Sequence, residues 1–152
     1  MIKKIALFVF FALVISCSCV YAQSALRPTF AGIYHSGLVG QVGIGTDIEK
    51  KHFGELRFGA TDVLEASFGI EGHFNRNIHQ SDWFNFHAGL MLGVYFYDEA
   101  RIGIPLGFTI KPIENHRNFA ILMEATPNVF TMSSYFNLRA NLGIRYTFRS
   151  RD

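Results

Sequence analysis

The chain has 152 residues, enough for one domain, and a formal net charge of only +2 at pH 7. No basic run marks a nucleic-acid-binding surface, and after residue 22 no apolar run approaches the about 20 residues of a transmembrane helix. The 16 Phe and 14 Gly residues fit membrane strands, in which alternation dilutes the apolar signal.

The first 22 residues have the pattern of a secretion signal. They carry Lys3 and Lys4 near the start, continue with the apolar run 5–15 and end in the small-residue cleavage site Val20-Tyr21-Ala22. A second pattern, 14–17, resembles a lipoprotein cleavage sequence and leaves open a lipidated Cys17. We favour cleavage after Ala22, because a barrel needs no lipid anchor to stay in its membrane.

Cleavage after Ala22 removes both cysteines and the two lysines. The remaining chain then carries equal numbers of basic and acidic residues and no thiol, which excludes disulfides, thiolate catalysis and cysteine metal sites. The expected organisation is a signal peptide at 1–22, a lead-in at 23–28, a barrel at 29–149 and a C-terminal tail at 150–152.

Eight segments alternate apolar and polar residues with the period of two that indicates β-strands. The predicted strands are Thr29–Ser36, Leu38–Asp47, His52–Thr61, Val63–Asn75, Trp83–Tyr97, Arg101–Lys111, Arg117–Phe130 and Tyr135–Arg149. The faces of the first strand stay unassigned. Pro105 in the sixth strand predicts a bulge, because proline donates no ladder hydrogen bond. No helical period follows the signal.

The last strand shows the alternation most clearly. One face is wholly apolar or aromatic, and the other carries three arginines and two asparagines. At about 3.3 Å per residue, this strand is long enough to cross a bilayer core when tilted. An even number of strands returns both chain ends to one side, as bacterial barrels require. The sequence therefore predicts an all-β fold: an eight-stranded antiparallel up-and-down transmembrane β-barrel with short loops.

The end of the chain also carries a family resemblance. The pattern Asn141-x-Gly143-x-x-Tyr146-x-Phe148 resembles the C-terminal assembly signal of bacterial outer-membrane proteins, although the chain continues for four residues beyond its final aromatic. The segments Ile104–Phe108, Phe119–Pro127 and Leu142–Phe148 are similar to small eight-stranded outer-membrane barrels common in Bacteroidota. The resemblance implies an integral outer-membrane location, contact with outer-membrane lipid and insertion by the assembly machinery. It implies little about activity.

Charged side chains line the inward face of the predicted barrel. The predicted lumen network comprises Glu55, Arg57, Glu65, Glu71, His73, His87, Arg101, Lys111, Glu124, Arg139 and Arg145. An eight-stranded barrel is only wide enough for its own side chains, so we expect an ion-paired, filled lumen. A narrow polar passage or a small-ligand pocket is the alternative.

Two ion pairs are predicted from the positions of the hairpin turns. A turn near Met132 places Glu124 opposite Arg139, and a turn near His79 places Glu71 opposite His87.

Two patterns suggest chemistry, and neither is specific. His73, His87, Glu65 and Glu71 are candidate metal ligands, but no short-spaced histidine pair supports a site, so we expect no metal or cofactor. His79-Gln80-Ser81 resembles the His-x-Ser of barrel lipid A deacylases, but it falls in a predicted turn instead of a lipid-facing strand.

The outward aromatics near strand ends fit an interfacial girdle: Phe84, Phe96, Tyr146 and Phe148.

The predicted loops indicate where partners bind. The outer turns are short, which argues against an adhesin or receptor: Ser36-Gly37, Thr61-Asp62, Asp98–Ala100 and Thr131–Ser134. The longer, charged connections would face the periplasm: Asp47–Lys51, Arg76–Asp82 and Pro112–His116. A periplasmic partner is therefore a hypothesis, and no nucleic-acid partner is expected.

The leading hypothesis is a non-enzymatic integral outer-membrane barrel with a filled lumen and a structural or interaction role. The alternatives are a narrow channel or small-molecule transport barrel, a lipid A-modifying enzyme, and a soluble periplasmic barrel of lipocalin type with its apolar face inward. The charged inward faces and the terminal assembly signal favour the membrane barrel over the lipocalin type.

Overall fold

The computed structural model describes residues 28–37, 39–61, 67–96 and 99–148. The predicted signal peptide and the C-terminal tail 150–152 lie outside these residues, as does Glu65. Apart from one 3₁₀ turn, η1 (Glu114–His116), the regular structure in the described ranges is β-strand. Within those same ranges, no helix has the length and apolar composition needed to cross a membrane.

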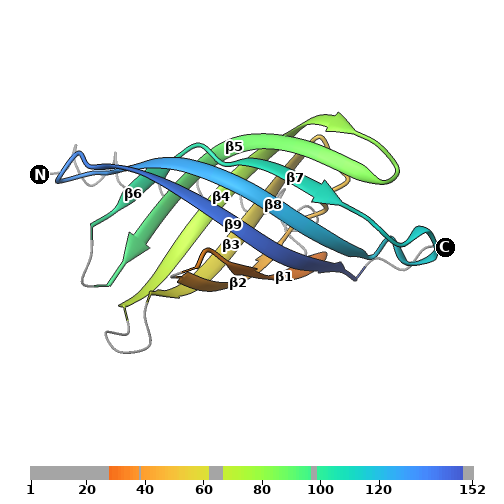
Figure 1. The fold of residues 1–152 in the computed structure, drawn as a ribbon, viewed down its shortest axis with the longest axis horizontal. Coiled ribbons are helices and arrows are strands. Elements are labelled where there is room, and N and C mark those ends of the chain that lie inside the picture. The colour runs from red at the N-terminus through yellow and green to blue at the C-terminus, as the bar shows by residue number, and fades with distance from the viewer. Residues whose placement is uncertain (1–27, 38, 62–66, 97–98, 149–152) are drawn as a thin grey trace, which may run out of the picture.

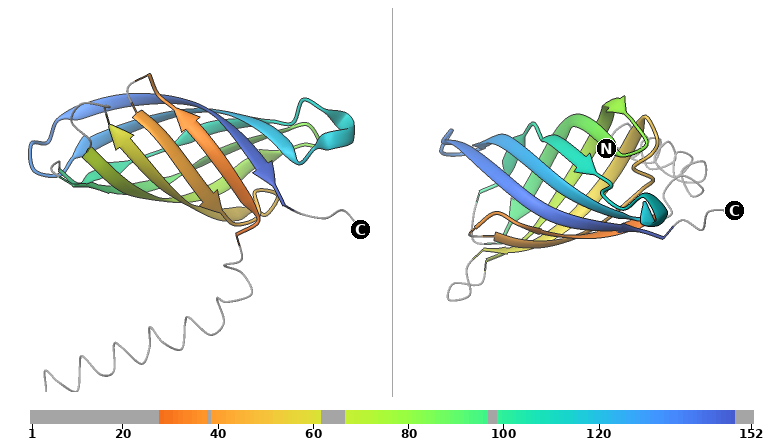
Figure 2. Two further views of the ribbon diagram at one scale, coloured as in Figure 1. Left: turned by 90° about the horizontal axis from the view of Figure 1, so that it is seen from below. Right: turned by 45° about the vertical axis from the view of Figure 1, so that its right-hand side comes forward.

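Consecutive antiparallel strands close into a barrel (Figure 1). The strands are β1 (Phe30–His35), β2 (Val39–Gly45), β3 (His52–Thr61), β4 (Ser67–Gln80), β5 (Phe84–Tyr95), β6 (Arg101–Gly103), β7 (Leu106–Ile110), β8 (Phe119–Phe130) and β9 (Phe136–Thr147). β1 pairs with both β2 and β9, and β4 pairs with β5, so the sheet is continuous round the wall. Figure 2 shows this wall from two further sides.

β6 and β7 are two halves of one wall strand. Both lie between β5 and β8, and they are separated at Ile104 and Pro105. The Ile104 amide donates to the Pro127 carbonyl on β8 at 3.0 Å, and the Gly89 amide on β5 donates to the Pro105 carbonyl at 3.0 Å. The main chain therefore stays hydrogen-bonded to both neighbouring strands across the break. The predicted eight-stranded antiparallel barrel is confirmed, and the irregularity predicted at Pro105 divides the strand.

The predicted end of the fourth strand was wrong. β4 continues beyond Asn75 to Gln80 and stays paired with β5, with a register irregularity between Asn77 and His79. Four of the five residues at 76–80 are polar, and the segment resembles a connection because its outward face lies near the end of the wall, where polar side chains are tolerated. The long connection predicted at Arg76–Asp82 is therefore only a short turn at 81–83.

The first strand, whose faces the sequence left unassigned, has aromatic rings inward. Phe30 and Tyr34 are buried, whereas Ile33 and His35 are exposed. The Tyr34 ring occupies space beside inward-facing glycines, including Gly143 on β9. Aromatic side chains therefore fill the barrel where the wall lacks side chains of its own.

This packing predicts the effect of a methyl group at Gly143. In Gly143→Ala the added carbon would overlap the Tyr34 ring and lie 2.8 Å from the Ile33 carbonyl oxygen. We expect a loss of about 1–3 kcal/mol in the free energy of unfolding, as for other overpacked sites. The matched control is Gly72→Ala, whose nearest atom would be the Leu92 carbonyl oxygen at 4.0 Å. Urea unfolding of both variants measures the difference; equal stabilities would contradict the packing argument.

Candidate functional site: a charged lumen inside an apolar wall

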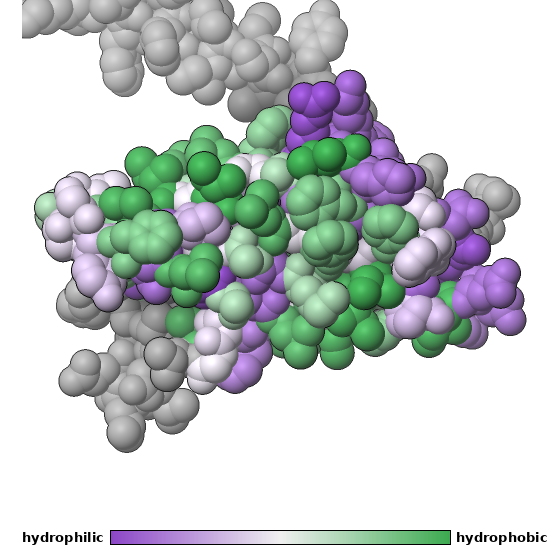
Figure 3. Space-filling view, turned by 45° about the horizontal axis from the view of Figure 1, so that its top comes forward, coloured by the Kyte–Doolittle hydropathy of each residue, from purple (hydrophilic) through white to green (hydrophobic). Residues whose placement is uncertain are grey.

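The outer wall of the barrel is apolar. Exposed aliphatic and aromatic side chains occur on every strand of the wall, among them Ile33, which is 68% exposed, and Val94, which is 62% exposed. Figure 3 shows one face of this surface, on which apolar residues cover most of the wall and hydrophilic residues gather toward the right-hand end. The polarity is the reverse of that of a water-soluble domain.

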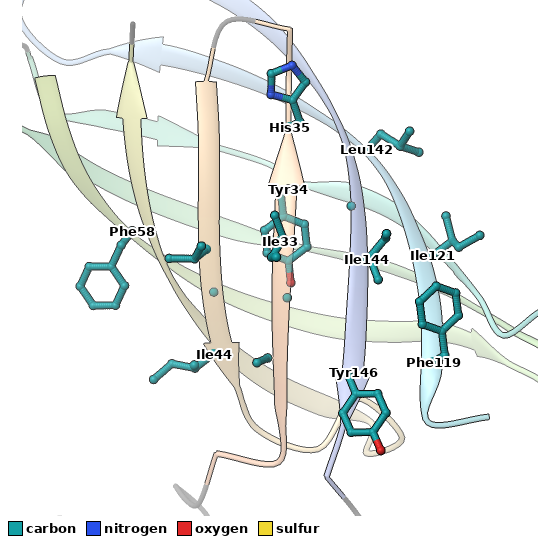
Figure 4. Close-up of a pocket in the computed structure, with 15 residues that line it drawn as sticks. Ile33, Tyr34, His35, Ile44, Phe58, Phe119, Ile121, Leu142, Ile144 and Tyr146 are labelled. Atoms are coloured by element: carbon teal, nitrogen blue, oxygen red, sulfur yellow. The ribbon is translucent and has the colours of Figure 1, made fainter. Parts of the chain in front are cut away.

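A shallow hollow interrupts the outer wall over β1, β2 and β9. It has a volume of about 790 Å³ and apolar walls that include Ile33, Ile44 and Ile144. Figure 4 shows its labelled side chains, with Phe58 and Ile121 directed away from the strands on either side. The hollow belongs to the outer surface, and it contains no cluster of polar groups suited to catalysis.

Ten of the predicted lumen residues lie in the described ranges, and all ten are buried. Glu65 lies outside those ranges. The ten buried residues share the interior with buried amide and hydroxyl side chains, including Gln41, Asn75, Thr109 and Asn141. Apolar and aromatic residues also face inward, among them Tyr34 on β1, Met91 on β5 and Leu122 on β8.

The centre of the lumen is a network of two arginines and two glutamates. Both oxygens of Glu124 accept hydrogen bonds from Arg57, at 2.7 and 2.8 Å. Glu55 accepts from Arg57 at 3.0 Å and from Arg145 at 2.6 Å. Arg145 also donates to the Tyr34 hydroxyl at 3.0 Å. Each guanidinium is thus paired, which offsets the cost of burying these charges.

A second network of buried side chains surrounds Glu71. Arg139 donates to both carboxylate oxygens of Glu71, at 2.5 and 2.7 Å. Tyr95 and Gln41 donate to the same carboxylate at 2.6 and 2.9 Å, and His73 lies 3.2 Å from it. Side chains from four strands, β2, β4, β5 and β9, therefore converge on one carboxylate.

Both predicted ion pairs were wrong. Arg139 lies opposite Thr126, and Glu124 lies opposite Asn141. On β5, His87 lies opposite Asn77, and Gly93 lies opposite Glu71. The hairpin turns are centred away from the assumed positions. The charged side chains therefore form ion pairs across the lumen instead of between neighbouring strands of one hairpin. His87 instead comes within 3.8 Å of Glu124.

A loop closes the barrel end that carries Phe30 and Thr147, named here the terminal end. In the segment 46–51, Ile48 is buried and packs in an apolar cluster with Phe30 and Phe53. The Ile48 carbonyl accepts hydrogen bonds from Asn77 at 2.8 Å and Asn85 at 3.4 Å. Beside it, Lys111 pairs with Glu49 at 2.8 Å. The connection predicted as a charged turn is therefore a plug.

Neither the candidate metal ligands nor the segment His79-Gln80-Ser81 forms a metal or catalytic site in the described ranges. No group of three or more His, Cys, Asp or Glu side chains in the described ranges is arranged to hold a metal. His79 stacks on Phe84 with ring centroids 5.0 Å apart, and the Ser81 amide donates to the Phe84 carbonyl.

The residues of the terminal motif divide between the two faces of β9. Asn141 and Gly143 face the lumen, and Tyr146 and Phe148 face outward with their rings 5.8 Å apart. Of the other girdle candidates, Phe96 is exposed and Phe84 is half-buried.

The sequence reasoning missed Phe30, Tyr34 and Ile48 as interior residues. The aromatic and glycine residues at 30, 32 and 34 share one face, which is a signal for Tyr34. A single apolar residue within the charged segment 46–51 is a signal for Ile48.

Comparison of the chain with protein-family models, curated proteins and solved structures yields no match. Arguments about function therefore depend on the chain's own residues.

Proposed function

We propose that the protein is an integral outer-membrane β-barrel with a filled lumen and a structural or interaction role, without catalytic activity. The carrying observation is the reversed polarity of the fold: charged residues such as Arg57 and Glu71 are fully buried, while aliphatic residues cover the wall. In water such a wall would be an aggregation hazard, whereas in a bilayer it is the stable arrangement.

The dimensions of the wall support this proposal. β5, β8 and β9 each contain 12 residues. With a rise of about 3.3 Å per residue and a tilt of roughly 40°, such strands reach roughly 30 Å along the barrel axis. An outer-membrane barrel needs an apolar band of about 25 Å.

The lumen favours a closed barrel over a channel or carrier. The Glu124 and Glu71 networks fill the interior, and the Ile48 plug covers the terminal end. A lipocalin-type barrel needs an apolar cavity for its ligand, and the described lumen is charged instead. A lipid A deacylase needs a rigid base that contacts its nucleophile, and the His79 ring instead stacks on Phe84.

The location rests on sequence patterns together with the wall. The secretion signal at 1–22 and the terminal motif ending at Phe148 resemble those of outer-membrane proteins, in particular the small barrels of Bacteroidota. We propose membrane lipid as the contact of the wall, the assembly machinery as a transient partner and a periplasmic partner at the terminal end. No cofactor is part of the proposal.

Electrophoresis of boiled and unboiled outer-membrane fractions tests the proposal. A barrel sealed by backbone hydrogen bonds resists detergent until it is heated, so we expect the protein in the membrane pellet and a band that shifts on boiling. Planar-bilayer recordings of the same preparation should show no conductance steps, because the lumen is filled.

Two results would overturn the proposal. Recovery of the protein in the soluble periplasmic fraction, with no band shift, would refute the membrane location. Discrete conductance steps would refute the closed lumen and favour the channel.

A further inference from the structure

β9 is paired along its whole length with β8 but along only half of it with β1. Its ladder with β8 extends from Tyr146 to Phe136, whereas its ladder with β1 ends where Leu142 meets His35. The cause is length, since β1 has 6 residues and β9 has 12. Figure 4 shows β9 continuing past His35, and Figure 1 shows the β8–β9 hairpin extending beyond β1 and β2. The segment 136–141, named here the β9 edge, has no described neighbour on that side.

The turn hydrogen bonds show which backbone groups face the open side. The Phe130 amide donates to the Tyr135 carbonyl at 3.0 Å, and the Thr147 amide donates to the Asn118 carbonyl at 2.8 Å, so odd-numbered residues of β9 bond to β8. Alternate residues of an antiparallel strand bond to opposite neighbours. Phe136, Leu138 and Ala140 therefore direct their N–H and C=O groups toward the open side.

The β9 edge lacks most of the features that usually protect sheet edges. Its one charged residue, Arg139, points into the lumen and is paired with Glu71. Its outward side chains are apolar, and Phe136 and Leu138 are both 62% exposed. No lysine or proline stands in the segment 136–141, and its pairing with β8 contains no bulge. Such an edge is a template for another strand.

The edge is also preorganised by the neighbouring loop. The Glu99 carboxylate accepts hydrogen bonds from the amides of Met132 and Ser133, at 3.0 and 2.8 Å. The Thr131 amide donates to the Ala100 carbonyl at 2.9 Å. The tip of the β8–β9 hairpin is thus held in place, which lowers the ordering cost of adding a strand.

We infer that the β9 edge is a strand-addition site that binds an extended segment of another polypeptide. Donors and acceptors that recur at every second residue match the repeat of an extended backbone, which is the basis of β-augmentation. The segment would alternate apolar residues, continuing the outer wall beside Leu138, with polar residues beside Arg139 on the lumen side. The preference for apolar residues on one face of the bound segment rests on the proposed membrane location. The direction of the backbone N–H and C=O groups of the β9 edge does not depend on that location.

A second copy of this chain does not fit the edge within one membrane. Antiparallel pairing of two β9 edges needs a two-fold axis perpendicular to the barrel wall, which would insert the second copy upside down. Parallel pairing of two β9 edges needs a two-fold axis along the strands, and because such strands tilt by roughly 40° from the barrel axis, the two barrel axes could not both follow the membrane normal.

The test uses the full chain in phosphatidylcholine vesicles and a fluorescent octapeptide of alternating valine and threonine as the probe. We expect saturable binding, with slower hydrogen exchange at the amides of Phe136, Leu138 and Ala140 and unchanged exchange at Asn137 and Arg139. Leu138→Pro removes one edge donor without touching the β8 ladder, and should weaken binding at least about tenfold. The control Leu138→Ala keeps the donor and should stay within about threefold of the unsubstituted protein.

Three outcomes would overturn the inference. Equal binding to the Leu138→Pro and Leu138→Ala variants would show that the backbone edge is not the site. Protection of the three amides without peptide, at every protein concentration, would show that the chain itself covers the edge. Protection that rises with protein concentration would assign the edge to a second copy. The boiling shift, measured on the same preparation, tests the membrane location separately, and a soluble barrel would allow the same exchange measurement in buffer.

Discussion

Substitution of Arg57 by methionine is expected to lower the free energy of unfolding by about 3–5 kcal/mol. Arg57 donates one hydrogen bond to each Glu124 oxygen and one to Glu55. Its loss leaves Glu124 buried, with His87 at 3.8 Å as its nearest remaining cationic candidate. Removing one member of a buried ion pair is costly because the other charge stays out of water without its counter-charge. Urea unfolding in lipid vesicles, followed by the fluorescence of the single tryptophan, Trp83, measures the change.

Two further variants separate the loss of charge balance from the loss of packing. The double variant Arg57→Met with Glu124→Met replaces both partners by apolar side chains and should recover most of the stability. Arg117→Met breaks a pair with Asp82, whose side chain is 90% exposed, and should cost at most about 1 kcal/mol. A loss below about 1 kcal/mol for Arg57→Met itself would show that the central network does not hold the barrel together.

Substitution of Leu90 by arginine is expected to cost about 2–4 kcal/mol in the bilayer. Leu90 lies on β5 midway between the barrel ends, points outward and is 48% exposed. In the proposed membrane location, a guanidinium there would lie near the bilayer midplane, where hydration is lost. The same unfolding measurement in vesicles gives the value.

A depth control makes this prediction specific for a membrane. Ile78→Arg also substitutes an exposed outward residue, 61% exposed, but near the terminal end of β4. Its cost should be only about 0–1 kcal/mol, because charges near the interface stay hydrated. In a water-soluble barrel both substitutions would change stability by about 0.5 kcal/mol or less. Equal, small effects at both positions would therefore refute the membrane location.

The sequence predicted the two faces of most strands because the period of two is a local property. Glu124 and Arg139 are both buried, as alternation requires, and Ile144 and Leu92 are both exposed. The strand count also followed, since the alternating segments are separated by recognisable turns. Poor alternation left the faces of the first strand unassigned, because alanine and glycine stand at 31 and 32.

Contacts across the lumen were beyond reach of the sequence. Arg57 and Glu124 are separated by 67 residues, and Arg139 and Glu71 by 68. Their meeting depends on the stagger of eight strands round a closed wall, to which every turn contributes. A turn centre displaced by one residue moves each cross-strand partner by two residues. The partner of Glu124 lies two residues from the predicted one and the partner of Glu71 lies six residues from it, so both predicted pairs were wrong.

The sequence by itself determined that this chain builds a strand-based wall with one apolar and one charged face, because side-chain direction along a strand is set residue by residue. Only the tertiary structure decided which charges pair, that Ile48 plugs one end, and that the segment 136–141 of β9 has a neighbouring strand, among the described residues, on one side only. Each of these depends on ring closure, since a short β1 beside a long β9 matters only once the barrel brings the first and last strands together.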